Sequence, residues 1–504
     1  MQRQYCHTDG EVRPLRILVD TNILIPLEPT SPSDLELGTP LAIDLIRYAN
    51  EKGHHICYHP SSRAEIAADK DVNRRSMRLA LLKKYEILEN PPAPSNEMQD
   101  SNISSHTGPH DLIDLQLLAA VAGDAVDILV TDDRGIWKTS ERFQLEDRVY
   151  SIDGAVELLQ SLLDKIPRPP PAIRNIKAHE IDQHDPIFSS LRDDYKGFDG
   201  WLAKCKREHR QAWIVINPGA AKYGGVAIVK EERNPDVSLE GRVLKICTFK
   251  ASDDSAGSKF GELLLRTIFE YSYKNLYDWM YLTTLPKQEK LIRLLSLFGF
   301  NEAQPKAVSK ELYFAKHLKP STVIADSLTA MDFHILYGPR FFRTTGVPTF
   351  VVPIRPQYHK LLFPELEPQP ELVPGRHPYG NAIRKAYLCG SMVKAIPPAS
   401  ILLFYRSHER QGIYTVGITE RTIGSNLPNE IAKFVGSRTV YTYMEIEEWC
   451  KKRVLAILFR QARCLDIPIS LTEMKNNGAL RGAPQSIVTV PKEAMPWLTS
   501  RLDQ

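Results

Sequence analysis

Residues 17–24, with the sequence ILVDTNIL, encode a strand that ends in a carboxylate. A run of aliphatic residues of this kind is typical of a strand that is covered on both faces. Asp20 would stand at the carboxyl end of that strand, on the edge where open α/β sheets place their ligands. Because a carboxylate is costly to bury without a partner, we expect a metal ion or another cation beside it.

The first third of the chain, residues 1–165, alternates between strand-like and helix-like segments. Strands are expected at 16–20, 54–59 and 127–133, and helices at 41–53, 61–85 and 110–123. This order predicts a parallel sheet with covering helices. The polar stretch 90–109 is expected to form a long loop.

Acidic residues recur at the rim of this expected sheet. Strand ends and helix starts lie on the same rim of a parallel α/β unit, so these side chains can converge; they are Asp20, Glu65, Asp111, Asp114, Asp132 and Asp133. Such a cluster repels itself unless a divalent cation neutralises it. All-oxygen ligation suits Mg²⁺ or Mn²⁺, and the matching chemistry is metal-assisted phosphodiester hydrolysis. The alternative is that each acid is a solvated helix cap.

In this order, ILVDTNIL, SSRAEI, HDLIDLQLLAA and DILVTDDRGI resemble a PIN domain over roughly residues 15–160. The resemblance implies an endoribonuclease with catalytic residues Asp20, Glu65, Asp114 and Asp133. Asp111 competes with Asp114, and Asp132 with Asp133, as metal ligands, and the choice stays open. Thr21, Asn22 and Thr131 would support these acids.

A second unit is expected at residues 174–320, after the proline-rich linker 166–174. Its helix that starts near AGSKFGELLLRTIF follows a strand and has small residues in its first turn, a pattern that favours binding of a pyrophosphate. Residues 180–318 resemble a GNAT-type acetyltransferase, which implies acetyl-CoA bound by Gly257, Ser258, Lys259, Phe260 and Gly261. Lys259 departs from the family's glycine pattern. Tyr313 is the nearest substitute for the family's tyrosine acid, and the alternative is a scaffold or ligand sensor.

Residues 321–380 are proline-rich and are expected to connect the units, and residues 381–504 to form a small β-barrel. Segments such as KAIPPASILLFYRS and GIYTVGITE resemble the ASCH and EVE domains of the PUA-like barrels, which implies RNA binding. Lys394, Arg406, Arg438 and Arg460 would contact phosphates, while Tyr405 and Tyr441 would stack on bases. The alternative is that each cation is a solvated surface group.

Charge is distributed unevenly along the chain. Residues 1–165 hold 17 Lys and Arg against 27 Asp and Glu, whereas residues 381–504 hold 17 against 10. This asymmetry favours a metal-binding head joined to a polyanion-binding tail. The seven cysteines form no CxxC pair, which argues against zinc ribbons and favours a reducing cytoplasm. No apolar run is long enough to span a bilayer.

The sequence therefore predicts an α/β multidomain protein: a PIN-like parallel α/β sandwich, a GNAT-like α/β domain and a PUA-like β-barrel. The leading hypothesis is a Mg²⁺- or Mn²⁺-dependent ribonuclease that binds acetyl-CoA and RNA, with tRNA as a candidate target. All three families recur in bacterial toxin–antitoxin and defence systems, so the resemblances imply a toxin with an antitoxin protein as partner. PIN heads often pair, which implies a second copy of the chain as another partner. Two rivals remain: an N-acetyltransferase with a silent PIN-like docking domain, and an RNA-binding regulator without enzymatic activity.

Overall fold

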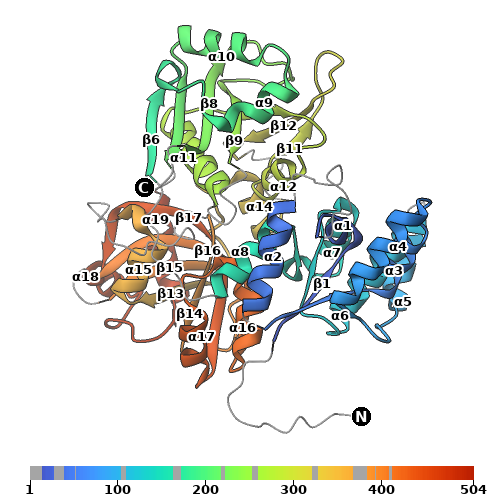
Figure 1. Cartoon of the computed structure of the whole chain (residues 1–504). Helices are drawn as coiled ribbons and strands as arrows, with labels where there is room; N and C mark the ends of the chain where they lie inside the picture. The colour runs from blue at the N-terminus through green and yellow to red at the C-terminus, as the bar shows by residue number, and fades with distance from the viewer. Residues whose placement is uncertain are drawn as a thin grey trace. The chain divides into compact units, whose positions relative to one another are not determined.

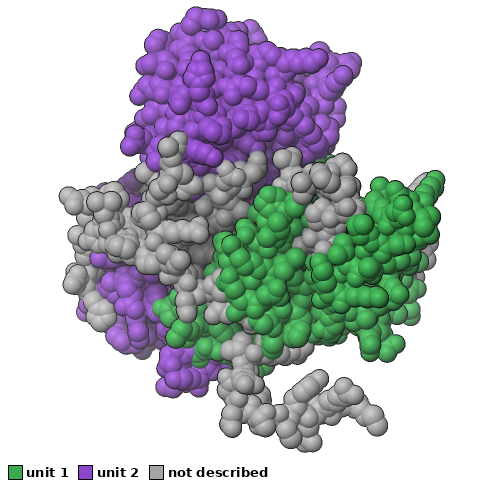
Figure 2. Space-filling view, viewed as in Figure 1, with its two compact units in different colours: residues 1–165, 427–437, 442–447 green, residues 166–426, 438–441, 448–504 purple. Residues whose placement is uncertain are grey.

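The structure is a computed structural model (Figure 1), and the statements below concern the residues that it describes: 14–27, 39–51, 53–103, 109–162, 172–216, 222–252, 259–320, 327–366, 383–391, 393–407 and 411–503. The chain divides into two compact units (Figure 2). Unit 1 comprises residues 1–165, 427–437 and 442–447, and unit 2 comprises residues 166–426, 438–441 and 448–504. In the described residues, no helix is long and apolar enough to cross a membrane.

Unit 1 is built on a parallel sheet of five strands in the order β3-β2-β1-β4-β5. The strands are β1 (Arg16–Val19), β2 (His55–Tyr58), β3 (Glu86–Ile87), β4 (Ile128–Val130) and β5 (Val149–Tyr150). Ile17, Leu18 and Val19 of the central strand are fully buried, as their aliphatic run predicts. The predicted parallel α/β architecture of this unit is confirmed.

The helices of unit 1 differ from the prediction at two places. They are α1 (Thr21–Leu27), α2 (Thr39–Glu51), α3 (Pro60–Ala67), α4 (Val72–Leu81), α5 (Asn96–Ile103), α6 (Pro109–Ala122), α7 (Arg134–Arg142) and α8 (Ile152–Leu162). The expected helix 61–85 is two helices, because Asp71 accepts a hydrogen bond from Arg74 N and starts α4 anew. Within the expected loop 90–109 lies α5, where Ser95 Oγ accepts from Met98 N and Met98 is buried.

A distant helix, α16 (Pro428–Val435), belongs to unit 1. Its Lys433 forms an ion pair with Asp127, whose Oδ2 also accepts a hydrogen bond from Arg16 N at 2.7 Å. Gly436 follows the helix with φ +51°, and a Cβ there would lie 2.7 Å from the hydroxyl oxygen of Tyr150. The close approach to Tyr150 and the positive φ both favour glycine.

The first sheet of unit 2 has seven strands in the order β11-β12-β10-β9-β8-β7-β6. They are β6 (Ala172–Lys177), β7 (Gln211–Ile216), β8 (Tyr223–Glu232), β9 (Val243–Ala251), β10 (Trp279–Thr284), β11 (Asn301–Ala303) and β12 (Leu312–His317). One face packs on α9 (Ser189–Asp194) and α10 (Phe198–Arg207), and the other on α11 (Phe260–Lys274) and α12 (Glu289–Leu297). Among the described strands of this sheet, β9 and β10 alone run parallel.

The second sheet of unit 2 has six strands in the order β14-β17-β16-β15-β13-β18. They are β13 (Thr349–Ile354), β14 (Arg384–Cys389), β15 (Ile401–Arg406), β16 (Gly412–Ser425), β17 (Val454–Ser470) and β18 (Val488–Thr489). The accompanying helices are α14 (Ala330–Tyr337), α15 (Pro356–Leu362), α18 (Leu471–Asn476) and α19 (Met495–Asp503). Helix α17 (Tyr443–Cys450) is divided between the units, with residues 443–447 in unit 1 and the rest in unit 2. In the described residues no pairing joins the outermost strands, so the predicted barrel is an open mixed sheet here.

The segment 321–380, expected to connect the units, contains regular secondary structure in its described middle. Its strand β13 pairs in parallel with β15 from Thr349 to Ile354. Pro353 argues against a strand because it has no N–H to donate. The pairing of β13 with β18, however, covers Phe350 and Val351 only. The proline therefore lies where the described sheet leaves one side of β13 without a partner strand.

Candidate functional sites

Asp20 lies at the tip of β1 and is buried, with 7% of its surface exposed. Its Oδ1 accepts a hydrogen bond from Thr21 N at 2.6 Å, and its Oδ2 accepts one from Thr131 Oγ1 at 2.7 Å. Burial raises the pKa of Asp20 to about 6 in spite of these two bonds, and the charges of Asp133 and Glu65 add to the rise. A charged Asp20 is therefore destabilised in this site near neutral pH.

Glu65 and the pair Asp114 and Asp133 lie on the same rim. Glu65 Oε2, in α3, accepts a hydrogen bond from Thr21 Oγ1 at 2.6 Å. Asp133 Oδ1 accepts from Gly135 N at 2.6 Å and so caps α7. A Cβ on Gly135 would lie 3.0 Å from Asp133 Oδ1 and 3.3 Å from Asp114 Oδ2. Both of these oxygens therefore face the start of α7.

Two further acids, Asp132 and Asp111, were predicted as metal ligands. Asp132 is exposed, and its Oδ1 accepts a hydrogen bond from Ile152 N at 3.4 Å. The side chain of Asp111 lies outside the described residues. Among the described side chains, no group of three or more His, Cys, Asp or Glu is arranged to hold a metal ion. A divalent ion does not fit these carboxylates as they lie, and no chemical step is derived through one.

The second candidate site is an opening between β9 and β10. These strands pair in parallel only from Val243 and Trp279 to Ile246 and Leu282, although β9 continues to Ala251. The pairing of β8 with β9 passes from Ile246 to Thr248, so Cys247 is an extra residue, a β-bulge. A bulge bends its strand. Close to this bulge the pairing of β9 with β10 ends, and no described strand pairs with that side of β9 beyond Ile246.

Helix α11 starts beside this opening. A Cβ on Gly224 of β8 would lie 2.4 Å from the ring of Phe260, and one on Gly225 would lie 3.0 Å from Leu264 Cδ1. These two glycines allow the first turns of the helix to pack closely on the sheet. Lys259 precedes the helix with φ +50°, and no described side chain caps its first N–H groups. An anion fits this end of the helix.

The predicted acetyl-CoA residues occupy this helix start in part. Lys259, Phe260 and Gly261 are described, whereas Gly257 and Ser258 lie outside the described residues. The ring of Phe260 is buried in the core, so only its backbone N–H could contact a ligand. Tyr313 lies in β12 opposite Thr283, the first residue of β10 beyond the paired stretch. Its hydroxyl is thus carried on the strand next to the opening.

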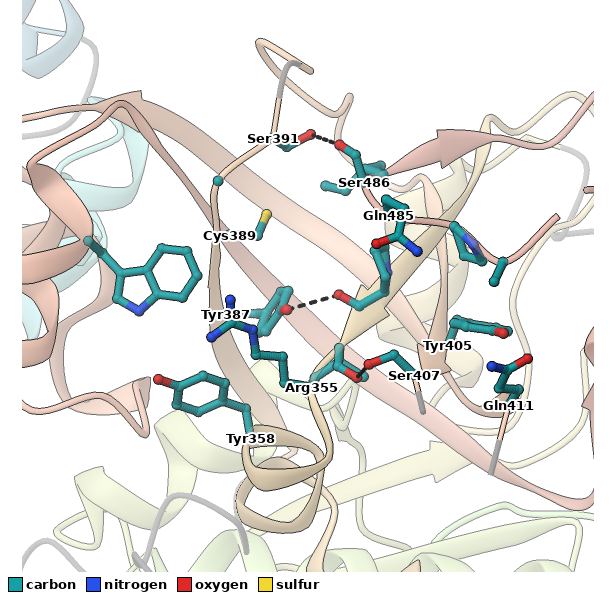
Figure 3. A pocket seen from close by; sticks show the side chains of 17 residues that line it. Arg355, Tyr358, Tyr387, Cys389, Ser391, Tyr405, Ser407, Gln411, Gln485 and Ser486 are labelled. Atoms are coloured by element: carbon teal, nitrogen blue, oxygen red, sulfur yellow. Dashed lines mark hydrogen bonds between the residues drawn. The ribbon is translucent and has the colours of Figure 1, made fainter. Parts of the chain in front are cut away.

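A pocket of about 400 Å³ in unit 2 is the third candidate site (Figure 3). Tyr387, Tyr405 and Trp449 give it aromatic walls, and no acidic residue is among its described lining. The guanidinium of Arg355 lies 5.9 Å from the centre of the Trp449 ring. The buried hydroxyl of Tyr405 has no hydrogen-bond partner in the described structure. A planar ligand that is neutral or anionic suits these walls.

The residues predicted to bind RNA have varied surroundings. Lys394 is exposed, whereas Arg406 and Arg460 are buried. Arg438 and Arg460 both bind Glu420, and Arg460 Nη1 donates to Leu297 O at 2.8 Å. Tyr441 is fully buried and donates its hydroxyl to Leu388 O at 3.1 Å. These contacts give Arg460 and Tyr441 structural partners inside unit 2.

The sequence does not identify Arg355, Tyr387 and Trp449 as residues of one pocket, because they lie in three separated segments of the chain. A signal did exist for Tyr405, whose aromatic ring follows a predicted strand of apolar residues. For the other three, no spacing along the chain indicates that they share a site.

No family model matches the chain, and no curated protein matches it. Similar solved structures include an ASCH protein from Zymomonas mobilis, 14% identical, with a TM-score of 0.24, covering 30% of this chain and 94% of that one. An IAA acetyltransferase from Bacillus cereus is 16% identical, with a TM-score of 0.23, covering 29% and 99%. A GNAT family acetyltransferase from Elizabethkingia anophelis with acetyl-CoA bound is 12% identical, with a TM-score of 0.22, covering 29% and 98%.

These similarities concern ASCH and GNAT proteins, each over less than a third of this chain. They give no support to the PIN resemblance of unit 1. With every TM-score below 0.5, the proposals that follow rest on contacts within this chain.

Proposed function

We propose that unit 2 transfers an acetyl group from acetyl-CoA to an amine. The observation that carries this proposal is the opening where β9 and β10 stop pairing, next to the start of α11. The backbone of β9 beyond Ile246 can form hydrogen bonds with an extended ligand that carries amide groups, as an added strand does. The first turn of α11 can hold the phosphates at the other end of that ligand.

The side chains near the opening have separate roles in this proposal. Acetyl-CoA supplies an acetyl group bound to a thioester sulfur. Lys259 adds positive charge at the start of the helix, where the phosphates bind. Tyr313 is our candidate for the group that returns a proton to the sulfur when the amine displaces it.

The transfer is tested with the full chain, labelled acetyl-CoA and aminoacylated tRNA or polyamines as acceptors. We expect label in the acceptor and one free thiol for each group transferred. Tyr313→Phe should lower the rate without changing the affinity for acetyl-CoA. Binding of acetyl-CoA without transfer to any acceptor would favour the rival hypothesis of a scaffold or sensor.

Substitution of Lys259 by glycine tests two effects separately: the backbone strain at this residue and the binding of acetyl-CoA. Glycine adopts a positive φ without the penalty of a Cβ, so Lys259→Gly should stabilise unit 2 by roughly 1 kcal/mol. Loss of the ammonium should weaken acetyl-CoA binding, on the order of threefold to tenfold. Urea denaturation and calorimetric titration measure the two effects. If affinity is unchanged, Lys259 does not contact the phosphates.

We also propose that unit 2 binds single-stranded RNA, with one base in the pocket of Figure 3. Support comes from the aromatic walls, the absence of acids from the described lining and the cation Arg355. A base stacked on an aromatic side chain contributes about 1–3 kcal/mol. Exposed Lys394 is the predicted phosphate contact that remains near the surface.

Two substitutions test the pocket by fluorescence anisotropy with a short labelled RNA. Trp449→Ala should weaken binding by about 1–3 kcal/mol. Tyr405→Phe removes a buried hydroxyl without a described partner, so it should leave stability unchanged or raise it slightly. It should nevertheless weaken binding of a base that bonds to this hydroxyl. Equal affinity in all three proteins would exclude the pocket as the base site.

A third proposal assigns RNA cleavage to the acids on the rim of unit 1, as the PIN resemblance implies. Its support is the buried Asp20, whose pKa is raised by burial and by the nearby Asp133 and Glu65. Carboxylates held in an unfavourable charge state are typical of functional sites. A matched pair of substitutions, described in the Discussion, tests this proposal.

A further inference from the structure

The first turn of α11 is bonded to the start of β14. Glu262 Oε2 accepts hydrogen bonds from Ile383 N at 2.7 Å and from Arg384 N at 3.3 Å. Ile383 is buried in the same core as Phe260 and Leu264. The carboxylate of Glu262 therefore ties the helix to a strand of the second sheet.

Strand β14 leads from this bond to the pocket. It starts at Arg384, and Tyr387 and Cys389, which line the pocket, follow within the same strand. Tyr387 also donates its hydroxyl to Pro353 O at 3.0 Å, so the strand is bonded to the opposite wall. A shift of the start of β14 would therefore displace residues in both walls of the pocket.

A second connection runs from α11 to α15. Arg266, one turn after Glu262, forms an ion pair with Glu365 at 3.5 Å. Glu365 follows α15, and the pocket residues Arg355 and Tyr358 lie at the start of that helix. Burial by itself would raise the pKa of Glu365, but the charges of Arg266 and Lys385 hold it at about 2. Glu365 is thus an anion, and it links α11 to the second wall.

We propose that the start of α11 and the pocket are energetically coupled through Glu262 and Arg266. An anion at the start of the helix repels the carboxylate of Glu262 and so favours its bonds to Ile383 N and Arg384 N. These bonds order β14, and the ion pair of Arg266 with Glu365 extends the effect to α15 and the second pocket wall. By reciprocity, a ligand in the pocket strengthens anion binding at the helix. The inference rests on the proposed binding of acetyl-CoA.

Hydrogen exchange of the full chain, with and without coenzyme A, tests the coupling. We expect slower exchange at the start of α11 and, about fivefold slower, at the amides of β14 and α15. Glu262→Ala should abolish the protection of β14 and keep that of α11. Glu262→Gln, which retains an acceptor oxygen, keeps the test usable if the alanine variant does not fold.

Glu270→Gln is the matched control, since the Glu270 side chain lies on the same helix, is 69% exposed and forms an ion pair with Arg266. It should leave the protection of β14 intact. Protection at α11 without any at β14 in the wild type would overturn the coupling and leave the transferase proposal standing. Absence of protection at α11 would overturn both.

Discussion

Replacement of Glu420 by alanine is expected to destabilise unit 2 by about 3–5 kcal/mol. Arg384 donates to both carboxylate oxygens of Glu420, at 2.6 and 2.9 Å, and Arg460 donates to Oε1 at 2.7 Å. Arg438 lies 3.2 Å from Oε2. Burial by itself would raise the pKa of Glu420, but these three guanidinium groups hold it far below its ordinary value. Removal of the carboxylate leaves the buried cations without their common partner.

Unfolding in denaturant, monitored by hydrogen exchange at the amides of β16 and β17, measures this loss of stability. Glu448→Ala is the matched control, because Glu448 forms an exposed ion pair with Lys451 and should change stability by less than about 1 kcal/mol. Since the pKa of Glu420 is lowered on folding, its contribution is present above the pKa of an unfolded glutamate and is lost as the pH falls below that value. Equal effects of both substitutions would mean that the cluster contributes little.

Local patterns in the sequence predict those parts of the fold that depend on local residues. Aliphatic runs predict β1 and β4, the apolar residues of 54–59 predict β2, and the βαβα order predicts their parallel pairing. Strands β3 and β5 contain two residues each, too few to produce a periodic pattern. The return of α16 to unit 1 depends on Lys433 and Asp127, which are about three hundred residues apart. No local property of the chain encodes such a contact.

In the candidate sites too, local patterns predict some residues, whereas contacts between distant segments decide the others. Asp20, Thr21 and Thr131 could be identified because each adjoins a predicted strand, and the structure joins them by hydrogen bonds. The opening at β9 lies beside the bulge at Cys247, and no residue type in the sequence predicts that bulge. The burial of Arg460 and Tyr441 depends on partners in other segments, which no local pattern in the sequence indicates.

Substitution of Asp20 by asparagine should abolish RNA cleavage and stabilise unit 1 at the same time. Folding raises the pKa of Asp20 from 3.8 to about 6, which costs about 3 kcal/mol of stability above pH 6. Asparagine removes this cost, but its amide faces the hydroxyl of Thr131, which now donates to Oδ2, and that conflict costs about 1–2 kcal/mol. The net gain at pH 8 is therefore about 1–2 kcal/mol.

The pH dependence of this gain follows from its cause. The cost of charged Asp20 arises as the pH rises from 3.8 to about 6, whereas the conflict with Thr131 does not depend on pH, so the advantage of asparagine should vanish at about pH 5 and reverse below it. Cleavage of total RNA, mapped by its new ends, should fall on the order of 100-fold to 1000-fold. Hydrogen exchange of β1 and β4 amides reports the stability of unit 1.

Asp127 provides the matched control, because it is a second buried acid at the same sheet with the opposite role. It accepts from Arg16 N and pairs with Lys433, so Asp127→Asn should destabilise unit 1 by about 3 kcal/mol and leave the cleavage rate of folded protein unchanged. If Asp20→Asn stabilises unit 1 and Asp127→Asn destabilises it, then Asp20 lowers the stability of the fold, as expected of a catalytic residue. If Asp20→Asn destabilises as Asp127→Asn does, Asp20 is structural, and the acetyl transfer of unit 2 becomes the sole enzymatic proposal for this chain.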